Sequence, residues 1–156
     1  MPHKQRIPKE KGQSLVELAI SLPVIILILM GTFDFGMALF SYSIMRDAAQ
    51  EGALYASFAP GNKSEIETRA RNILVRQDDE VFSSPIDLRD KKAVQIEINI
   101  KGRECQGITK GIANHIEVRV IYKYPFFMPF VSRIIGSNTI QMTASASNVV
   151  LQPPCE

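Results

Sequence analysis

The chain has 156 residues, of which 46% are hydrophobic, and its formal net charge is +2. This length allows one membrane segment and one small domain, and a nearly balanced charge argues against a nucleic-acid-binding protein. The basic excess is confined to residues 1–12, where four Lys or Arg residues stand against Glu10 alone. A short basic segment before an apolar run predicts membrane topology rather than a binding surface.

The most apolar part of the chain follows this basic segment. No residue from Leu18 to Phe33 is charged, and none from Phe35 to Met45. The first run is slightly shorter than the ~17–25 residues that cross a bilayer, but it continues past Asp34. We therefore expect one long helix over residues 13–59, with a transmembrane segment at about 18–40. The lysines before it predict a single-pass protein of the cytoplasmic (inner) membrane, with the N-terminus in the cytoplasm and the remainder outside.

Three interpretations of this segment compete. A cleaved secretory signal peptide fits the basic start, but the apolar stretch is long and lacks a small-x-small site followed by polar residues. A plain signal anchor leaves Glu17 unexplained, because an acidic side chain costs about 2.5–3.5 kcal/mol at the centre of a membrane helix, and less near its end. The third interpretation rests on the residues that surround Glu17.

Residues 12–56 resemble the N-terminus of TadE-like proteins, the pseudopilins of the tight adherence (Flp) pilus assembly system. The family pattern is Gly-Gln-x-x-Val-Glu, an apolar helix containing Pro, then Asp-Phe-Gly, then Ala-x-Glu-Gly-Ala-x-Tyr-Ala. The chain departs from it at Leu18, where pilin-type sites commonly have an aromatic residue. It matches the pattern at Gly12, Gln13, Val16, Glu17, Pro23, Asp34, Phe35, Gly36, Ala49, Glu51, Gly52, Ala53, Tyr55 and Ala56.

The resemblance implies that residues 1–12 are a leader, which a prepilin peptidase removes by cutting between Gly12 and Gln13. The new α-amine would have a pKa of about 7.7–8.0 and would be mostly protonated at neutral pH. Glu17 follows about one helical turn later and could pair with this amine or with that of a neighbouring subunit. The alternative is that the Glu17 side chain reaches the lipid headgroups from near the helix end.

Small residues mark the second half of the long helix. Ala48, Gly52 and Ala56 recur every four residues and form a stripe that another element can approach closely. Either the protein's own domain or a partner pilin helix would cover this stripe. Asp34 is expected at the outer membrane interface, or paired within an assembly.

A second, amphipathic helix is predicted in KSEIETRARNILVRQDDE. Ser64 is the expected N-cap, with Glu67 completing a capping box. Glu65 with Arg69, and Glu67 with Arg71, have the spacing of surface ion pairs. The apolar face is expected to contain Ile66, Ala70, Ile73 and Leu74.

Three later segments read as strands: AVQIEINI, HIEVRVIYKY and NTIQMTASASNVVL. Alternating apolar residues in each predict one buried face. We therefore expect an α+β fold, in which the long N-terminal transmembrane helix continues into a small extracytoplasmic domain, residues 60–156, with one further helix and a three-stranded antiparallel sheet. Between the second and third strands lies an apolar loop that either plugs the core or touches lipid headgroups or a pilus component; it contains Phe126, Phe127, Met128 and Phe130.

The two cysteines, Cys105 and Cys155, follow the first and third predicted strands. Those strands run parallel in an up-down-up meander, so both cysteines would emerge at the same end. Outside the cytoplasm a disulfide between them is permitted, and two free thiols are the alternative. No spacing in the sequence suggests a metal or cofactor site, and His115 is expected to be hydrogen-bonded or exposed rather than a ligand.

The outer domain is not expected to be an enzyme. Asp78, Asp79 and Glu80 are adjacent acids without a basic partner, which is typical of a solvated loop rather than a catalytic pair. The resemblance implies a minor structural or assembly component of a tight adherence pilus, with the membrane, other pilins and pilus assembly proteins as partners. A single-pass, membrane-tethered binding module that is neither processed nor polymerised is the alternative.

Overall fold

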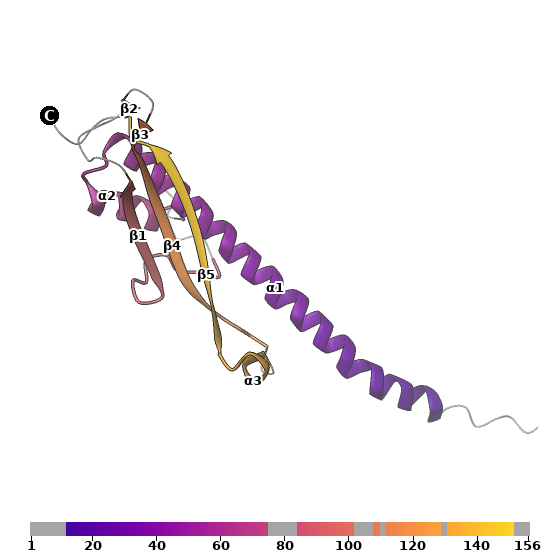
Figure 1. Cartoon of the computed structure of the whole chain (residues 1–156). Coiled ribbons are helices and arrows are strands. Elements are labelled where there is room, and N and C mark those ends of the chain that lie inside the picture. Colours follow the sequence, from indigo (N-terminus) through magenta and orange to yellow (C-terminus); the bar gives the residue numbers. More distant parts are fainter. Residues whose placement is uncertain (1–11, 75–83, 102–107, 110–111, 129–130, 152–156) are drawn as a thin grey trace, which may run out of the picture.

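One long helix organises the fold. The structure, a computed structural model, describes residues 12–74, 84–101, 108–109, 112–128 and 131–151. Helix α1, Gln13–Phe58, has 46 residues and is therefore ~69 Å long. Its first half extends away from the other elements, whereas its second half lies against them (Figure 1). The helix continues through Pro23, a residue that membrane helices tolerate.

The second helix, α2, spans Lys63–Arg71 and packs against α1. Its N-cap is Asn62, whose side-chain Oδ1 accepts a hydrogen bond from the Glu65 N–H over 3.2 Å. The expected capping box at Ser64 is therefore wrong, because the chain enters the helix two residues earlier and Ser64 already lies inside it. Asn and Ser are comparable N-caps, so composition did not separate the two positions.

A three-stranded antiparallel sheet forms the centre of the domain. Its strands are β1 (Val94–Lys101), β4 (His115–Pro125) and β5 (Thr139–Val149), in the order β1-β4-β5. Val94 pairs with Tyr122 at one end of the β1–β4 ladder, and Pro125 pairs with Thr139 where β4 turns toward β5. The meander and the α+β class predicted from the sequence are confirmed.

Three short elements were not predicted. Strands β2 (Ile108–Thr109) and β3 (Ile112–Ala113) pair with each other, and helix α3 (Val131–Ile135) lies in the β4–β5 connection. Gly136 follows α3 with a φ of 73°, a left-handed conformation that glycine adopts without steric cost. Elements of two to five residues are too short to show a hydrophobic period.

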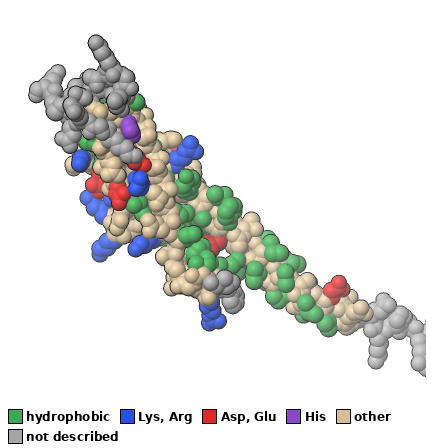
Figure 2. All heavy atoms as spheres, viewed as in Figure 1, with side chains coloured by type: hydrophobic (Ala, Val, Ile, Leu, Met, Phe, Trp, Pro, Cys, Tyr) green, Lys and Arg blue, Asp and Glu red, His purple; other side chains and the backbone are tan. Residues whose placement is uncertain are grey.

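The sheet has one covered face and one polar face. Helix α1 contacts β4, β5 and α2, and every second residue of β4 from Ile116 to Tyr124 is buried. On the opposite face Arg119 reaches Glu117 at 3.2 Å and Glu97 at 3.7 Å. Figure 2 shows charged side chains over the domain and apolar side chains along the free N-terminal half of α1. This division is common for antiparallel sheets with one solvated face.

The core is the layer between α1 and the sheet. Near the middle of α1 it is built on Met45, Val120 and Tyr124, which Ile86 and Leu88 from the segment before β1 join. Nearer the end of α1 it is built on Ala56, Ile66 and Val118. The Leu151 N–H donates to the Ser57 carbonyl over 2.8 Å, so the chain beyond β5 is attached to the C-terminal end of α1.

Candidate functional site

The N-terminal part of α1, residues 13–30, lies outside the packed layer between α1 and the sheet. Every residue there except Ser21 is exposed, including Leu15, Ile20 and Leu29 at 63–70%. Among the described elements, α1 is the helix that is long and apolar enough to cross a membrane. A rod of exposed large apolar side chains is unfavourable in water. The chain thus has the features of a single-pass membrane protein.

Gly12, Gln13 and Glu17 lie at the free end of this rod. Gly12 takes the N-cap position without a side-chain hydrogen bond, and a Cβ built there would meet nothing within 4 Å. Glu17 is exposed, and α1 contains no basic residue before Arg46. No side chain of α1 before Arg46 can therefore supply a cation for Glu17.

Asp34 stands where the free half of α1 meets the domain. It is only 6% exposed. Its Oδ1 accepts a hydrogen bond from the Tyr124 hydroxyl over 2.7 Å, and its Oδ2 accepts one from the Met128 N–H over 3.4 Å. The partner of Asp34 thus belongs to the same chain. Sequence reasoning missed this pair, although Tyr124 continues the buried alternation of β4.

Tyr124 belongs to a column of three aromatic rings. Its ring meets those of Tyr122 and Phe126 edge-on, with centroids 6.4 and 6.1 Å away. Burial, and then the hydrogen bond to Asp34, raise the pKa of the Tyr124 hydroxyl well above its ordinary value. Tyr124 therefore keeps its proton and remains a donor to Asp34 throughout the neutral pH range.

The apolar loop between β4 and β5 is divided between two environments. Phe126 packs against the core, but Phe127 is 62% exposed. Met128 lies against the helix, since a Cβ built at Gly31 would be 3.0 Å from its Cε. The core-plug interpretation therefore holds for Phe126 and is wrong for Phe127. Phe130 lies outside the described residues.

The small-residue stripe of α1 is covered by the chain's own domain. Ala48, Gly52 and Ala56 are buried. A Cβ built at Gly52 would be 3.2 Å from both the Cβ of Ala70 in α2 and a Cγ of Val118 in β4. Of the two coverings that the sequence left open, the structure therefore shows the protein's own domain.

Arg71 connects α2 to the segment before β1 and to the first residue of β1. Its guanidinium donates to the Leu88 carbonyl over 2.6 Å and to the Val94 carbonyl over 3.2 Å. It also donates to Glu67 over 2.8 Å, and this hydrogen bond holds the pKa of the Glu67 carboxyl below its ordinary value. The predicted pairing of Glu67 with Arg71 is confirmed, but its predicted place on the surface is wrong, because Arg71 is buried. Glu65 and Arg69 form the exposed pair at 3.2 Å.

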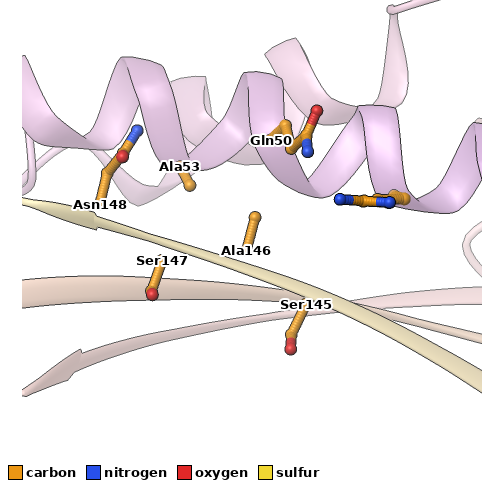
Figure 3. A pocket seen from close by; sticks show the side chains of 7 residues that line it. Gln50, Ala53, Ser145, Ala146, Ser147 and Asn148 are labelled. Atoms are coloured by element: carbon orange, nitrogen blue, oxygen red, sulfur yellow. The ribbon is translucent and has the colours of Figure 1, made fainter.

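A polar groove of about 410 Å³ runs between α1 and the edge strand β5. Figure 3 shows Ala53 and Ala146 facing each other across the layer, whereas Ser145 and Ser147 point away from α1. Gln50 and Asn148 supply amide groups at its rim. These groups can form hydrogen bonds but include no nucleophile activated by a base. In the described part of the chain, no three His, Cys, Asp or Glu residues gather to hold a metal.

The residues singled out from the sequence thus fall into two separate places. Gly12, Gln13 and Glu17 lie at the exposed tip of α1, and the Ala48–Ala56 stripe lies under the domain at its other end. Cys105 and Cys155, the leader residues 1–11 and the acidic run at 78–80 lie outside the described residues.

A comparison with known proteins finds a similarity in the N-terminal helix. Residues 12–54 match the family model described as TadE-like protein, a range that begins at Gly12 and covers most of α1. No curated protein and no solved structure matches the chain. The resemblance to TadE-like proteins is confirmed over residues 12–54.

Proposed function

We propose that the chain is a pilin-like membrane protein that serves as a minor structural or assembly component of a tight adherence (Flp) pilus. The family match over residues 12–54 supports an association with that pilus system. The observation that carries the proposal is the exposed apolar half of α1. Its only acid before Asp34 is Glu17, which follows about one helical turn after the Gly12-Gln13 pair.

The proposed mechanism is mechanical. The helix first resides in the inner membrane, with the domain outside the cytoplasm. A prepilin peptidase cuts between Gly12 and Gln13, and the new amine pairs with Glu17 of its own chain or of a neighbouring subunit. Assembly proteins then move the helix from lipid to the helices of neighbouring pilins, which again cover its apolar surface.

The second half of α1 keeps the domain attached during this transfer. Gly52 packs directly against α2 and β4, and Asp34 is hydrogen-bonded to Tyr124. Only the free half of α1 therefore has to change its surroundings. In this role the outer domain is a non-catalytic structural unit that requires no metal or cofactor.

Mass spectrometry of the mature N-terminus tests the processing step. The protein, purified from cells with and without the matching prepilin peptidase, is expected to begin at Gln13 only where the peptidase is present. Gly12→Leu should block the cut, because the substitution adds a side chain where the peptidase meets none. Intact, leader-bearing protein from pilus-forming cells would contradict the proposal and favour the membrane-tethered binding module.

The mass of the mature N-terminus and the number of pili together test the ion pair. Glu17 can pair only with a free amine, so Gln13 must not have cyclised to pyroglutamate. Glu17→Ala and Glu17→Gln are expected to leave membrane insertion intact and to reduce pilus number. Ser21→Ala, one turn further along the free half of α1, is the matched control and should leave pili unchanged. Wild-type piliation of Glu17→Ala cells would contradict the proposed role of Glu17.

A further inference from the structure

The connection between β4 and β5 forms a second apolar surface beside the membrane helix. We call residues Phe126–Met128 and 131–138 the hairpin tip. It contains helix α3 and lies on the side of the domain nearest the free half of α1 (Figure 1). Phe127 and Ile135 in this tip are 62% and 57% exposed. Exposed apolar side chains of this size on a small domain indicate a contact surface.

An apolar groove of about 410 Å³ joins the hairpin tip to α1. It is lined by Leu29, Met30 and Phe33 from the helix and by Phe127 and Met128 from the tip. Leu29 and Phe33 are themselves more than 60% exposed. The groove is therefore continuous with the apolar surface of the membrane helix.

The depth of the hairpin tip follows from its contacts with α1. Met128 reaches Gly31 through its side chain and Asp34 through its N–H. The stretch from Gln13 to Phe33 rises about 31 Å, close to the ~30 Å hydrocarbon thickness of a bilayer. If the span began later, at Leu18, its outer boundary would lie further along α1 and the tip would be deeper still. Either span places the tip at or below the boundary between hydrocarbon and headgroups.

The charge of the hairpin tip suits the same location. Arg133, exposed in α3, is the one charged residue in the sequence between Lys123 and Glu156. An Arg beside aromatic and aliphatic side chains can reach lipid phosphates while its neighbours remain in the acyl region. Asp34, which accepts a hydrogen bond from Met128 of the tip, is buried against Tyr124 and so presents little negative charge at the surface.

We propose that the hairpin tip is a second membrane contact, in which phospholipid acyl chains fill the groove and Arg133 binds headgroup phosphates. The tip thereby fixes the domain against the bilayer at a set depth beside α1. This inference requires only that α1 spans the membrane. It does not depend on leader cleavage or on a role in pili, so it is tested with purified, uncleaved chain.

The sequence contains no tryptophan, so Phe127→Trp places a single tryptophan at the hairpin tip, which can be excited selectively over the tyrosines. The full chain is placed in nanodiscs of phosphatidylcholine and phosphatidylglycerol, one copy per disc. Emission is compared in discs with and without lipids brominated near the headgroup end of the acyl chain. Phe33→Trp reports the depth of α1, and Phe58→Trp, 51% exposed at the far end of α1, is the matched control.

The Phe127→Trp chain is expected to emit at shorter wavelength than the Phe58→Trp control. Brominated lipid should quench it to an extent similar to the Phe33→Trp chain. Adding Arg133→Glu to Phe127→Trp should reduce that quenching, whereas adding Arg133→Lys should preserve it.

Three outcomes would overturn the proposal. The first is emission from the Phe127→Trp chain like that of the Phe58→Trp control. The second is quenching that Arg133→Glu leaves unchanged. The third is a blue shift that is absent with one copy per disc and appears only in a second preparation with two copies per disc, which would place a second copy of the chain in the groove.

Discussion

The hydroxyl of Tyr124 donates a 2.7 Å hydrogen bond to the carboxylate of Asp34, a residue 90 positions earlier in the chain. This bond joins the end of β4 to the point where the free half of α1 ends. It lies in a buried environment, where a hydrogen bond to a charged group is stronger than in water. The pair therefore adds a buried polar contact at the place where α1 leaves the domain, beside the apolar packing that holds the second half of the helix.

Replacement of Tyr124 by Phe should destabilise the domain by about 1.5–3 kcal/mol, the range for hydrogen bonds to charged groups. The ring would still pack, but Oδ1 of the buried Asp34 would lose its donor. Chemical unfolding of the full chain in detergent micelles measures the change. Tyr42→Phe, at an exposed position of α1, is the control and should alter stability by less than ~0.5 kcal/mol. Equal stabilities of the two variants would contradict the importance of the pair.

Stability should fall at alkaline pH, partly through Tyr124. Its pKa is raised in the folded state, so the folded protein holds this proton more tightly than the unfolded chain. The contribution is complete below the ordinary pKa of 10.0 and is lost as the pH rises through that value toward the raised pKa. Unfolding free energies measured across this range should fall less steeply for Tyr124→Phe. Tyr122, whose pKa is also raised by burial, should account for part of the remaining fall.

The close contact at Gly52 should make that position intolerant of side chains. A Cβ at position 52 would already lie 3.2 Å from side-chain atoms of both Ala70 and Val118, so the longer side chain of Gly52→Leu would collide with them. Overpacking of this kind costs about 1–3 kcal/mol. Gly36→Leu is the matched control on the same helix, because a Cβ there meets nothing within 4 Å. This control should be neutral or stabilising by up to ~1 kcal/mol through higher helix propensity. Thermal unfolding followed by circular dichroism compares the pair, and a tolerated Gly52→Leu would contradict the packing described.

The buried and exposed arginines of α2 should differ sharply. Arg71→Leu removes donors from two backbone carbonyls and from Glu67, which should cost at least about 1.5–3 kcal/mol. Arg69→Leu breaks an exposed ion pair with Glu65, worth about 0.2–1 kcal/mol, and a cation–π contact with the Tyr55 ring at 5.0 Å, worth about 0.5–1 kcal/mol. Chemical denaturation of both variants under one set of conditions distinguishes them. Similar losses would show that Arg71 contributes no more than a surface residue.

Membrane orientation is a separate prediction from the basic segment. Alkaline phosphatase fused after Glu156 should be active, because the enzyme needs an oxidising compartment to form its disulfides. Green fluorescent protein fused before Met1 should fluoresce. Replacement of Lys4, Arg6, Lys9 and Lys11 by Gln should reduce phosphatase activity, since cytoplasmic positive charge sets the orientation. Inactive phosphatase in the wild-type fusion would contradict an extracytoplasmic domain.

Several features follow directly from local sequence. The uninterrupted apolar run of α1 and the alternation of β1 and β4 identified a membrane helix and two half-buried strands. The spacing of Glu65 and Arg69 identified an ion pair. Each of these depends on neighbours along one element, which the periods of helix and strand relate without knowledge of the fold.

Other features were decided only when the elements packed. The sequence singled out Asp34 and the Ala48–Ala56 stripe but not Tyr124. The periodicity of an element shows which of its faces is apolar, but it does not show which other part of the protein covers that face. The burial of Arg71 and the exposure of Phe127 likewise depend on whether another part of the chain reaches them. Partners 90 positions apart, as Asp34 and Tyr124 are, meet only because α1 and β4 lie side by side, and that arrangement is a property of the tertiary fold.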